Sequence, residues 1–525
     1  MKDIKLTILE TSDLHGHIYP IHYGTNEYQP LGLAKIATYI EEVREQEPHT
    51  LLIDNGDQFQ GTPLTYHYVR NQSHLANPVT QTLNHLHYDA AVIGNHEFNY
   101  GMQPLNQAVS ESNFPWLSAN IVDSVTNEPY FGQPYLIKKL TEDFKVAILG
   151  LTTHYIPNWE KPEHIKDLAF EDCLESAARW VSYIRTHEQP DLLIVSYHGG
   201  FEKNLSTGEP TETLSGENQA YEICQKVEGI DVLLTGHQHR LLADEVNGVS
   251  IVQPGCNGAY VGRVDLHFQQ NDLEKWVCIH KQSSLVPMES HVAHETIQAI
   301  NQVYEEATQT WLDQPIGKIE GNMVITDAFH ARLEEHPLVE FINNVQMDVA
   351  DVDISNTALF NNQARGLPTD VTMRDIVSNY IYPNTLTVLE VTGRDIKEAL
   401  ERSASYFIIR EDGEIDVNPS FYEPKPQHYN YDMWEGIDYT INVAKPIGQR
   451  VTSLTKDGSP LAESQTYQVV MNNYRATGGG EYHMFKGKKV VKEIQIDMTE
   501  ILANYFVKHP LIKAETNQNW RVVKG

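Results

Sequence analysis

Short apolar runs rich in β-branched residues alternate with amphipathic stretches through the first half of the chain. The runs predict strands at residues 5–9, 51–54, 90–93, 143–151, 192–195 and 232–234. Helical periodicity predicts helices at 33–45 and 171–185, and further strands are expected at 248–268 and 272–289. Strands that are apolar along their whole length are typical of sheets covered on both faces. The alternation therefore indicates a layered α/β domain.

The pattern changes after residue 315. A helix is expected at 292–311, followed by helices at 337–349, 371–379 and 395–403, strands at 385–392, 439–443 and 467–471, and a Pro-rich loop at 418–427. A chain of 525 residues is too long for a single core. We therefore expect a layered α/β domain at 1–290, a linker helix at 291–314 and a mixed α/β domain at 315–525.

Composition and charge narrow the classes of partner. The hydrophobic content of 41% is typical of a globular protein, and the net charge of −32 argues against binding of a nucleic acid polymer. No apolar run reaches membrane-spanning length, so no membrane association is expected. The N-terminus lacks the pattern of a signal peptide, and the four cysteines are widely spaced without a CxxC pair. We expect a cytoplasmic monomer.

Five polar clusters follow directly after predicted strands. They are D13-L-H15-G, N55-G-D57, G94-N-H-E97, S196-Y-H198-G and T235-G-H237-Q-H239. Carboxylate, imidazole and amide oxygen groups are the ligands that Zn²⁺, Mn²⁺ and similar ions use, and loops converge at the carboxyl ends of strands. Asp13 and His15 lie two residues apart, so on an extended segment both can face one centre, and Gly236 permits close backbone approach.

Each cluster alone is weak support for a site. A single histidine is more often a surface or satisfied core residue, and Asp-x-His by itself carries little information. Five clusters in matching positions after strands are much stronger support than any one of them, and together they predict a two-metal hydrolytic site. His22, His154, His280 and His483 lack this context and are interpreted as ordinary residues.

The clusters resemble the motifs of calcineurin-like metallophosphoesterases, and NNYRATGGG at 472–480 resembles the nucleoside-binding segment of the 5′-nucleotidase family. The resemblance covers nearly the whole chain. It implies an N-terminal four-layer αββα metallophosphoesterase domain and a C-terminal 5′-nucleotidase domain that binds the nucleotide.

Within that family, GNHEFNYG at 94–101 is similar to the 2′,3′-cyclic-nucleotide 2′-phosphodiesterase/3′-nucleotidase branch, whose members are usually exported. The 5′-nucleotidase branch usually has Asp where this chain has Asn99. The alternatives are a 5′-nucleotidase or UDP-sugar diphosphate hydrolase and, from a different class, a non-catalytic nucleotide-binding module.

The resemblance also implies roles for individual residues. Asp13, His15 and His239 would hold one divalent cation, and Asn95, His198 and His237 would hold the other, with Asp57 bridging. His96 would stabilise charge or protonate the leaving group. Tyr474 and Tyr431 would stack on the nucleobase, with Tyr429 as the next choice, and Asn362 and Arg365 could contact phosphate or ribose.

Overall fold

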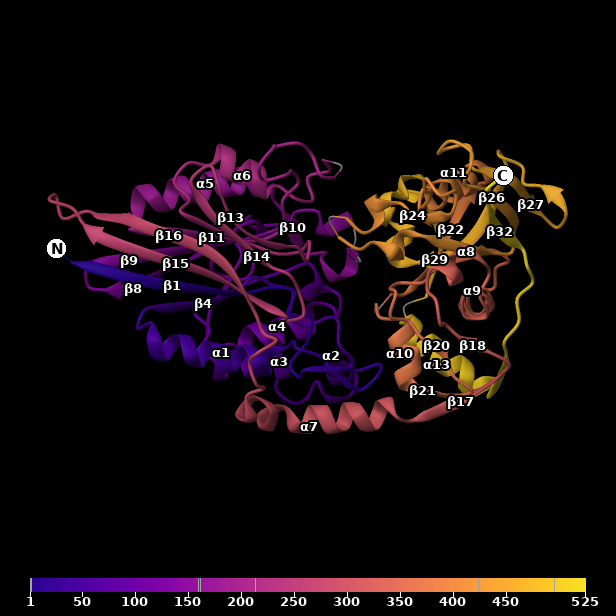
Figure 1. Cartoon of the computed structure of the whole chain (residues 1–525), viewed down its shortest axis with the longest axis horizontal. Helices are drawn as coiled ribbons and strands as arrows, with labels where there is room; N and C mark the ends of the chain where they lie inside the picture. Colours follow the sequence, from indigo (N-terminus) through magenta and orange to yellow (C-terminus); the bar gives the residue numbers. More distant parts are fainter. Residues whose placement is uncertain are drawn as a thin grey trace. The chain divides into compact units, whose positions relative to one another are not determined.

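The chain forms two compact units, Met1–Thr308 and Gln309–Gly525. The computed structural model describes residues 2–158, 160, 162–212, 214–382, 384–423, 425–494 and 496–525. The division lies within helix α7 (Glu295–Leu312), which forms where the helix at 292–311 is expected. In Figure 1 the first unit is coloured indigo to magenta and the second orange to yellow.

Two six-stranded mixed sheets form the centre of the first unit. The first has the order β16-β15-β1-β4-β5-β6, with bounds Trp276–Pro287, Tyr260–Gln270, Asp3–Thr11, Thr50–Asp54, Ala90–Val92 and Trp116–Leu117. The second has the order β13-β14-β12-β11-β9-β8, with bounds Leu241–Val246, Val249–Pro254, Val232–Thr235, Leu192–His198, Phe144–Thr152 and Tyr135–Thr141. In each sheet the inner strands are parallel, with antiparallel strands toward an edge.

Alternating side chains of each strand enter different cores. In β11, Leu192 and Ile194 pack in the core shared by the two sheets, whereas Leu193 and Val195 pack in the core on the other face. Both faces of the strand are therefore buried, which is why its sequence is apolar without interruption.

Helices cover the outer faces of the two sheets (Figure 1). Helices α5 (Cys173–His187) and α6 (Ala220–Lys226) contribute to the outer core of the second sheet. On the other side lie α1 (Leu33–Gln46), α3 (Pro78–His85) and α4 (Met102–Glu111). The predicted four-layer αββα arrangement is confirmed.

The second unit is a mixed α/β domain, as predicted. Its largest sheet has the order β25-β19-β29-β22-β30, with bounds Asp432–Glu435, Ser355–Ala358, Thr466–Asn472, Leu386–Thr392 and Lys489–Ile494. Helices α9 (Pro337–Ala350) and α11 (Gly393–Ala404) contact this sheet, whereas α10 (Met373–Asn379) and α13 (Met498–Lys508) contact each other, and α13 contacts β17 (Pro315–Glu320). Helix α11 begins with a capping box between Thr392 and Asp395.

Two details of the second unit differ from the prediction. The helix expected at 371–379 begins only at Met373, because β21 (Asp370–Thr372) pairs with β17 (Pro315–Glu320). The loop expected at 418–427 contains a 3₁₀ turn at Pro419–Phe421, and its Pro424 lies outside the described residues.

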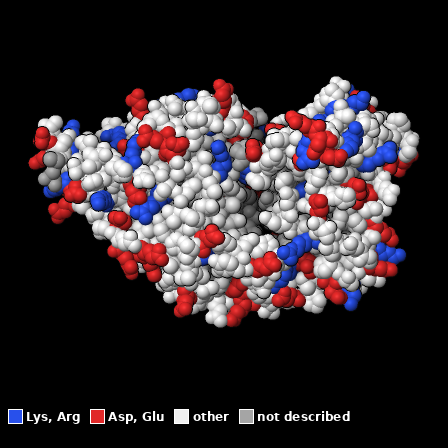
Figure 2. Space-filling model, in the orientation of Figure 1, with Lys and Arg blue, Asp and Glu red and all other residues white. Residues whose placement is uncertain are grey.

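Acidic side chains outnumber basic ones, but the two kinds are not separated into different regions of the surface shown. On the face shown in Figure 2, Asp and Glu side chains are distributed over both units with Lys and Arg among them. Among the described residues, the helices are all too short or too polar to traverse a lipid bilayer.

Candidate metal centre

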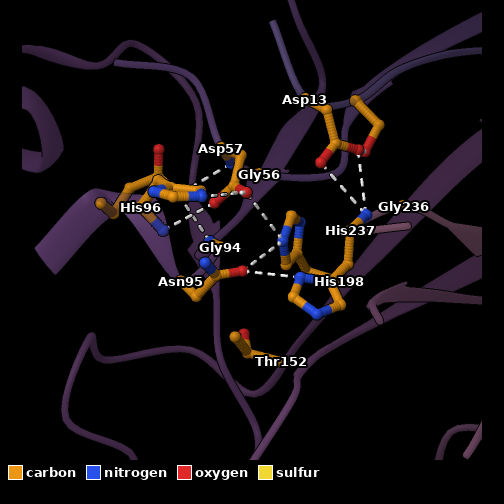
Figure 3. A network of polar contacts seen from close by, with 12 residues as sticks. Asp13, Gly56, Asp57, Gly94, Asn95, His96, Thr152, His198, Gly236 and His237 are labelled. Carbon is orange, nitrogen blue, oxygen red and sulfur yellow. Dashed lines mark hydrogen bonds and ion pairs between the residues drawn. The ribbon is translucent and has the colours of Figure 1, made fainter. Parts of the chain in front are cut away.

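The five polar clusters meet at the carboxyl ends of five strands. Three clusters follow β1, β4 and β5 of the first sheet, and the other two begin in the last residues of β11 and β12 of the second. Parallel neighbours end at the same edge of a sheet, so segments separated by up to 226 positions, from Asp13 to His239, come together. Figure 3 shows the central part of this arrangement.

The backbone of the ligand loops adopts an unusual conformation. Positive φ angles of 52°, 49°, 58°, 68° and 57° occur at Asp13, His15, Asp57, His237 and His239. The expectation that Asp13 and His15 lie on an extended segment is therefore wrong. Left-handed backbone costs about 1–3 kcal/mol at a residue with a side chain, and such strain clusters at functional sites.

Hydrogen bonds between two loops hold this conformation. The backbone N–H of Asp13 donates to the Gly56 carbonyl at 2.9 Å, and that of His15 donates to the Asp57 carbonyl at 2.9 Å. The loops after β1 and β4 thus remain paired beyond the ends of their strands, and this pairing turns the side chains inward.

The first group of donors consists of Asp13, His15 and His239. His239 Nε2 lies 3.3 Å from Asp13 Oδ1 and 3.0 Å from His15 Nε2. The Asp13 carboxylate also accepts from Ser12 Oγ at 2.6 Å and from the backbone N–H of His237. Asp13 therefore links the loop after β1 to the loop after β12.

The second group consists of Asp57, Asn95, His198 and His237 (Figure 3). His198 Nε2 lies 3.2 Å from Asp57 Oδ2 and 3.1 Å from Asn95 Oδ1. His237 Nδ1 lies 2.8 Å from the same Asn95 oxygen. The structure brings the predicted side chains together in two groups. That each group holds one cation, with Asp57 bridging, stays a prediction.

The other nitrogen of three of these rings is occupied by a hydrogen-bond acceptor. His15 Nδ1 faces the Gln60 carbonyl at 2.8 Å, His198 Nδ1 faces the Asn55 carbonyl at 2.7 Å, and His237 Nε2 faces Glu217 at 2.9 Å. Each of those nitrogens must carry the hydrogen, which leaves a lone pair on the nitrogen that points into the site when the ring is neutral.

Lone pairs therefore converge in both groups. In the second group the inward nitrogens of His198 and His237 surround the oxygens of Asp57 and Asn95, none of which carries a hydrogen of its own. A cation at the centre removes this repulsion, so the donor set fits divalent metal ions with nitrogen and oxygen ligands.

The electrostatics agree with a cation site. Burial opposes the charge of His198, but Asp57 outweighs it and raises the pKa of His198 to about 10, so the site attracts positive charge. Burial and the neighbouring His239 lower the pKa of His15 to about 3. Burial disfavours the Asp57 carboxylate, yet His198 and His96 hold its pKa well below the usual range.

His96 lies beside the second group and points into the site (Figure 3). Its backbone N–H donates to Asp57 Oδ1 at 2.7 Å, and its Nε2 lies 4.0 Å from Asp57 Oδ2. Its ring also makes an edge contact with His15, with 5.3 Å between ring centroids. His96 is thus adjacent to the ligands, as predicted.

Glu97 is a site residue that sequence reasoning missed. Its buried carboxylate accepts backbone N–H groups from Asp57 at 2.8 Å, Gln58 at 2.6 Å and Gly94 at 2.6 Å. Burial and Asp57 raise the pKa of Glu97 to about 8, while the hydrogen bonds from the N–H groups of Gln58 and Asp57 favour the carboxylate. Glu97 ties the loop that carries Asp57 to the loop that carries Asn95, and only the tertiary contacts show this.

Glycine is required at two positions of the site. A Cβ on Gly94 would lie 2.3 Å from Asp57 Oδ1, and one on Gly236 would lie 2.1 Å from Ser12 Oγ. The close approach predicted at Gly236 is confirmed. Glu217 and Glu160, by contrast, lie in segments without a recognisable motif, and no sequence signal pointed to them.

Tyr431 does not fit the predicted stacking role. Its side chain is fully buried, its ring stacks on Tyr406 with centroids 4.9 Å apart, and its hydroxyl has no hydrogen-bond partner among the residues that the structure describes. A ring enclosed by the core cannot face a nucleobase. Tyr431 immediately precedes β25, and its orientation is set by the packing of that strand in the core.

Tyr429 and Tyr474 are better placed than Tyr431 to stack on a nucleobase. Both are partly exposed, and the buried Arg475 connects their segments. Arg475 donates to the Tyr429 carbonyl at 2.9 Å and forms a two-pronged ion pair with Asp432, with N–O distances of 2.7 and 3.0 Å. Gly479 lies against the Tyr474 ring, because a Cβ there would be 2.6 Å from that ring.

Asn362 and Arg365 are exposed side chains in the second unit. Asn362 accepts from Arg332 at 2.8 Å, and its amide nitrogen lies 3.1 Å from His428 Nε2. Burial and Arg332 lower the pKa of His428 to about 4, which keeps this ring neutral. Asn362 thus has fixed polar neighbours, and its contact with a substrate stays a prediction, as does that of Arg365.

Two family models match the chain. Residues 6–241 match the calcineurin-like phosphoesterase model, and residues 315–487 match that of the 5′-nucleotidase C-terminal domain. The crystal structure of a proposed 5′-nucleotidase from Staphylococcus aureus is 37% identical, with a TM-score of 0.92, and the match covers 99% of this chain and all of that one. The chain belongs to the 5′-nucleotidase family. It is thus a member of a family of metallophosphoesterase hydrolases.

Curated relatives are more distant. A 2′,3′-cyclic-nucleotide 2′-phosphodiesterase/3′-nucleotidase from Yersinia enterocolitica is 28% identical over 99% of this chain and 88% of its own length. The trifunctional nucleotide phosphoesterase protein YfkN of Bacillus subtilis is 27% identical over 99% of this chain, which spans 39% of YfkN. The family is thus shared, and the substrate differs among its members.

Proposed function

We propose that this protein is a dinuclear metal-dependent phosphohydrolase of nucleotides that acts on 2′,3′-cyclic nucleotides and 3′-nucleotides. The observation that carries the proposal is the convergence of two groups of lone-pair donors, Asp13 with His15 and His239, and Asp57 with Asn95, His198 and His237. The Asn at position 99 and the relative from Yersinia support the choice of substrate.

The two groups would each hold one divalent cation, Zn²⁺, Mn²⁺ or a similar ion. Bound there, the cations would lower the pKa of a water molecule and neutralise phosphoryl oxygens. His96 is positioned next to the Asp57 carboxylate, where Nε2 of the ring protonated on both nitrogens can donate to a phosphoryl oxygen or to the leaving oxygen. Tyr429 and Tyr474 would contact the nucleobase.

Metal binding is tested separately from activity. We expect wild-type protein to bind two equivalents of Mn²⁺ or Zn²⁺ in titration calorimetry and by elemental analysis. His15→Ala and His198→Ala should each lose about one equivalent. His280→Ala is the matched control, because His280 is an exposed histidine of the same unit. Equal metal content in all four proteins would refute the assignment of the site.

Activity is tested on 2′,3′-cyclic AMP, 3′-AMP, 5′-AMP and UDP-glucose with each metal. Hydrolysis of the first two supports the proposal. His96→Ala should lower kcat by about 10²–10⁴-fold, the usual contribution of general acid–base catalysis, without loss of metal. Loss of metal in that variant would instead identify His96 as a ligand.

A 5′-nucleotidase is the second candidate, favoured by the similarity to the Staphylococcus aureus structure. Preference for 5′-AMP would replace the proposed substrate by this one. Failure to release phosphate from any of the four compounds, with both metals bound, would indicate a non-catalytic nucleotide-binding module.

A further inference from the structure

A chain of three polar side chains extends from His96 away from the metal centre. His96 Nδ1 lies 2.6 Å from Asn99 Oδ1, Asn99 Nδ2 donates to Glu160 Oε2 at 2.8 Å, and His164 Nδ1 lies 2.9 Å from Glu160 Oε1. Glu160 is buried, and each oxygen of its carboxylate faces one of these two side chains. Two separate segments, 96–99 and 160–164, are joined in this way.

The chemistry of Glu160 determines the direction of the whole chain. A carboxylate only accepts hydrogen bonds, so Asn99 must turn its NH₂ group toward Glu160. The carbonyl oxygen of Asn99 then faces His96, and a carbonyl oxygen only accepts. His96 Nδ1 must therefore carry the hydrogen, which leaves Nε2 as the nitrogen that faces the site, 4.0 Å from Asp57 Oδ2.

We propose that Glu160 is a positioning residue that locks the amide of Asn99 and thereby sets the tautomer and orientation of His96. An asparagine at this position can present either face, unlike an aspartate, both of whose oxygens accept. Without Glu160, the Asn99 amide can turn over and donate to Nδ1, which places the hydrogen of the neutral ring on Nε2. The proposal rests on the proposed function only for its effect on catalysis.

The tautomer can be observed directly. Long-range ¹H–¹⁵N correlation spectra of histidine-labelled protein in mildly alkaline buffer distinguish the two tautomers, and a spectrum of His96→Ala identifies the His96 signals. We expect the Nδ1–H form in wild type and in Glu163→Ala, and a shift toward the Nε2–H form in Glu160→Ala. Glu163 is an exposed neighbour of the same turn and is the matched control. The same tautomer in wild type and Glu160→Ala would overturn the proposal, whatever the substrate.

Steady-state kinetics test whether the orientation of Asn99 affects catalysis through His96. Nε2 can donate a proton only from a ring that carries a hydrogen on both nitrogens; the Asn99 oxygen accepts the hydrogen on Nδ1, whereas a turned-over amide would oppose it. This donation matters for a nucleoside leaving group and little for 4-nitrophenolate. Glu160→Ala should therefore lower kcat for the preferred nucleotide by about 10- to 100-fold, part of the usual general-acid contribution, and kcat for a 4-nitrophenyl phosphate ester by less than about 3-fold. An equal loss for both substrates, or loss of metal, would show a purely structural role and refute the proposal.

Two further variants separate orientation from charge. Glu160→Gln keeps an oxygen that can accept from Asn99, so it should retain most of the activity. Asn99→Asp places two carboxylates side by side and should be impaired, whereas Asn99→Asp with Glu160→Gln restores a donor facing an acceptor and should recover activity. If the double variant is no better than Asn99→Asp alone, the lock is not the function of Glu160. A wild type inactive on nucleotides would refute the proposed function, and the tautomer spectra would still decide this proposal.

Discussion

Substitution of Glu97 by glutamine gives a sharp test of how the two central loops are held together. In the wild type, Oε2 accepts the N–H groups of Asp57 and Gly94, and Oε1 accepts that of Gln58. A glutamine can place its oxygen on only one side. The preferred orientation retains the two bonds to Asp57 and Gly94, and its NH₂ group then faces the N–H of Gln58.

The cost follows from these contacts. One buried donor loses its acceptor, and the other two bonds lose the contribution of the negative charge, so we expect a destabilisation of about 2–4 kcal/mol. In a unit of about 300 residues each kcal/mol corresponds to about 1.5 °C, so the melting temperature of the first unit should fall by about 3–6 °C. Because Asp57 loses a fixed neighbour, metal affinity should fall about 10- to 100-fold.

Differential scanning calorimetry and metal titration measure the two effects. Glu142→Gln removes the same charge from an exposed position of the first unit and should leave both quantities unchanged. A melting temperature and metal affinity of Glu97→Gln equal to those of the wild type would show that the three short N–H contacts do not hold the loops, and the reasoning would fail.

Three other predictions concern separate parts of the chain. Tyr431→Phe removes a buried hydroxyl that has no partner in the described part of the chain, so the second unit should be as stable as wild type or up to about 1–3 kcal/mol more stable in urea, with KM unchanged. Tyr429→Ala should raise KM for nucleotides about 10- to 100-fold through loss of a stacking contact. A KM unaffected by Tyr429→Ala would exclude that residue from the substrate site. Glu217→Gln should weaken metal binding by about 10-fold or more in calorimetry without loss of fold, because the partner of His237 Nε2 loses its charge, and unchanged affinity would contradict this role. Burial, with Glu435 and Glu335 nearby, raises the pKa of Glu340 to about 7, so the folded form favours the protonated carboxyl. This contribution to stability is complete below pH about 4.5 and is lost as the pH rises through about 7, so Glu340→Gln should raise the urea midpoint at pH 8 and have little effect at pH 4.5. An equal effect of the substitution at both pH values would argue against a raised pKa of Glu340.

Several features of the chain could be predicted because their signals are local. The uninterrupted apolar runs of β1 and β11 indicate strands covered on both faces, and the polar clusters that follow them have the chemistry of metal ligands. The separation of the chain into unlike halves is also visible in the pattern. Local chemistry was less informative in the second unit, where aromatic residues near 429–434 suggest stacking and core packing equally well.

The sequence alone identifies which side chains carry the chemistry and which strands present them, because residue type and periodicity are properties of short segments. Tertiary structure alone decided how those side chains are oriented: the left-handed backbone at Asp13 and Asp57, the three N–H groups gathered by Glu97, the link from Asn99 to Glu160, and the burial of Tyr431. Each of these depends on which distant segments meet and at what register, and hydrogen-bond direction and exclusion from solvent exist only once those segments are packed together.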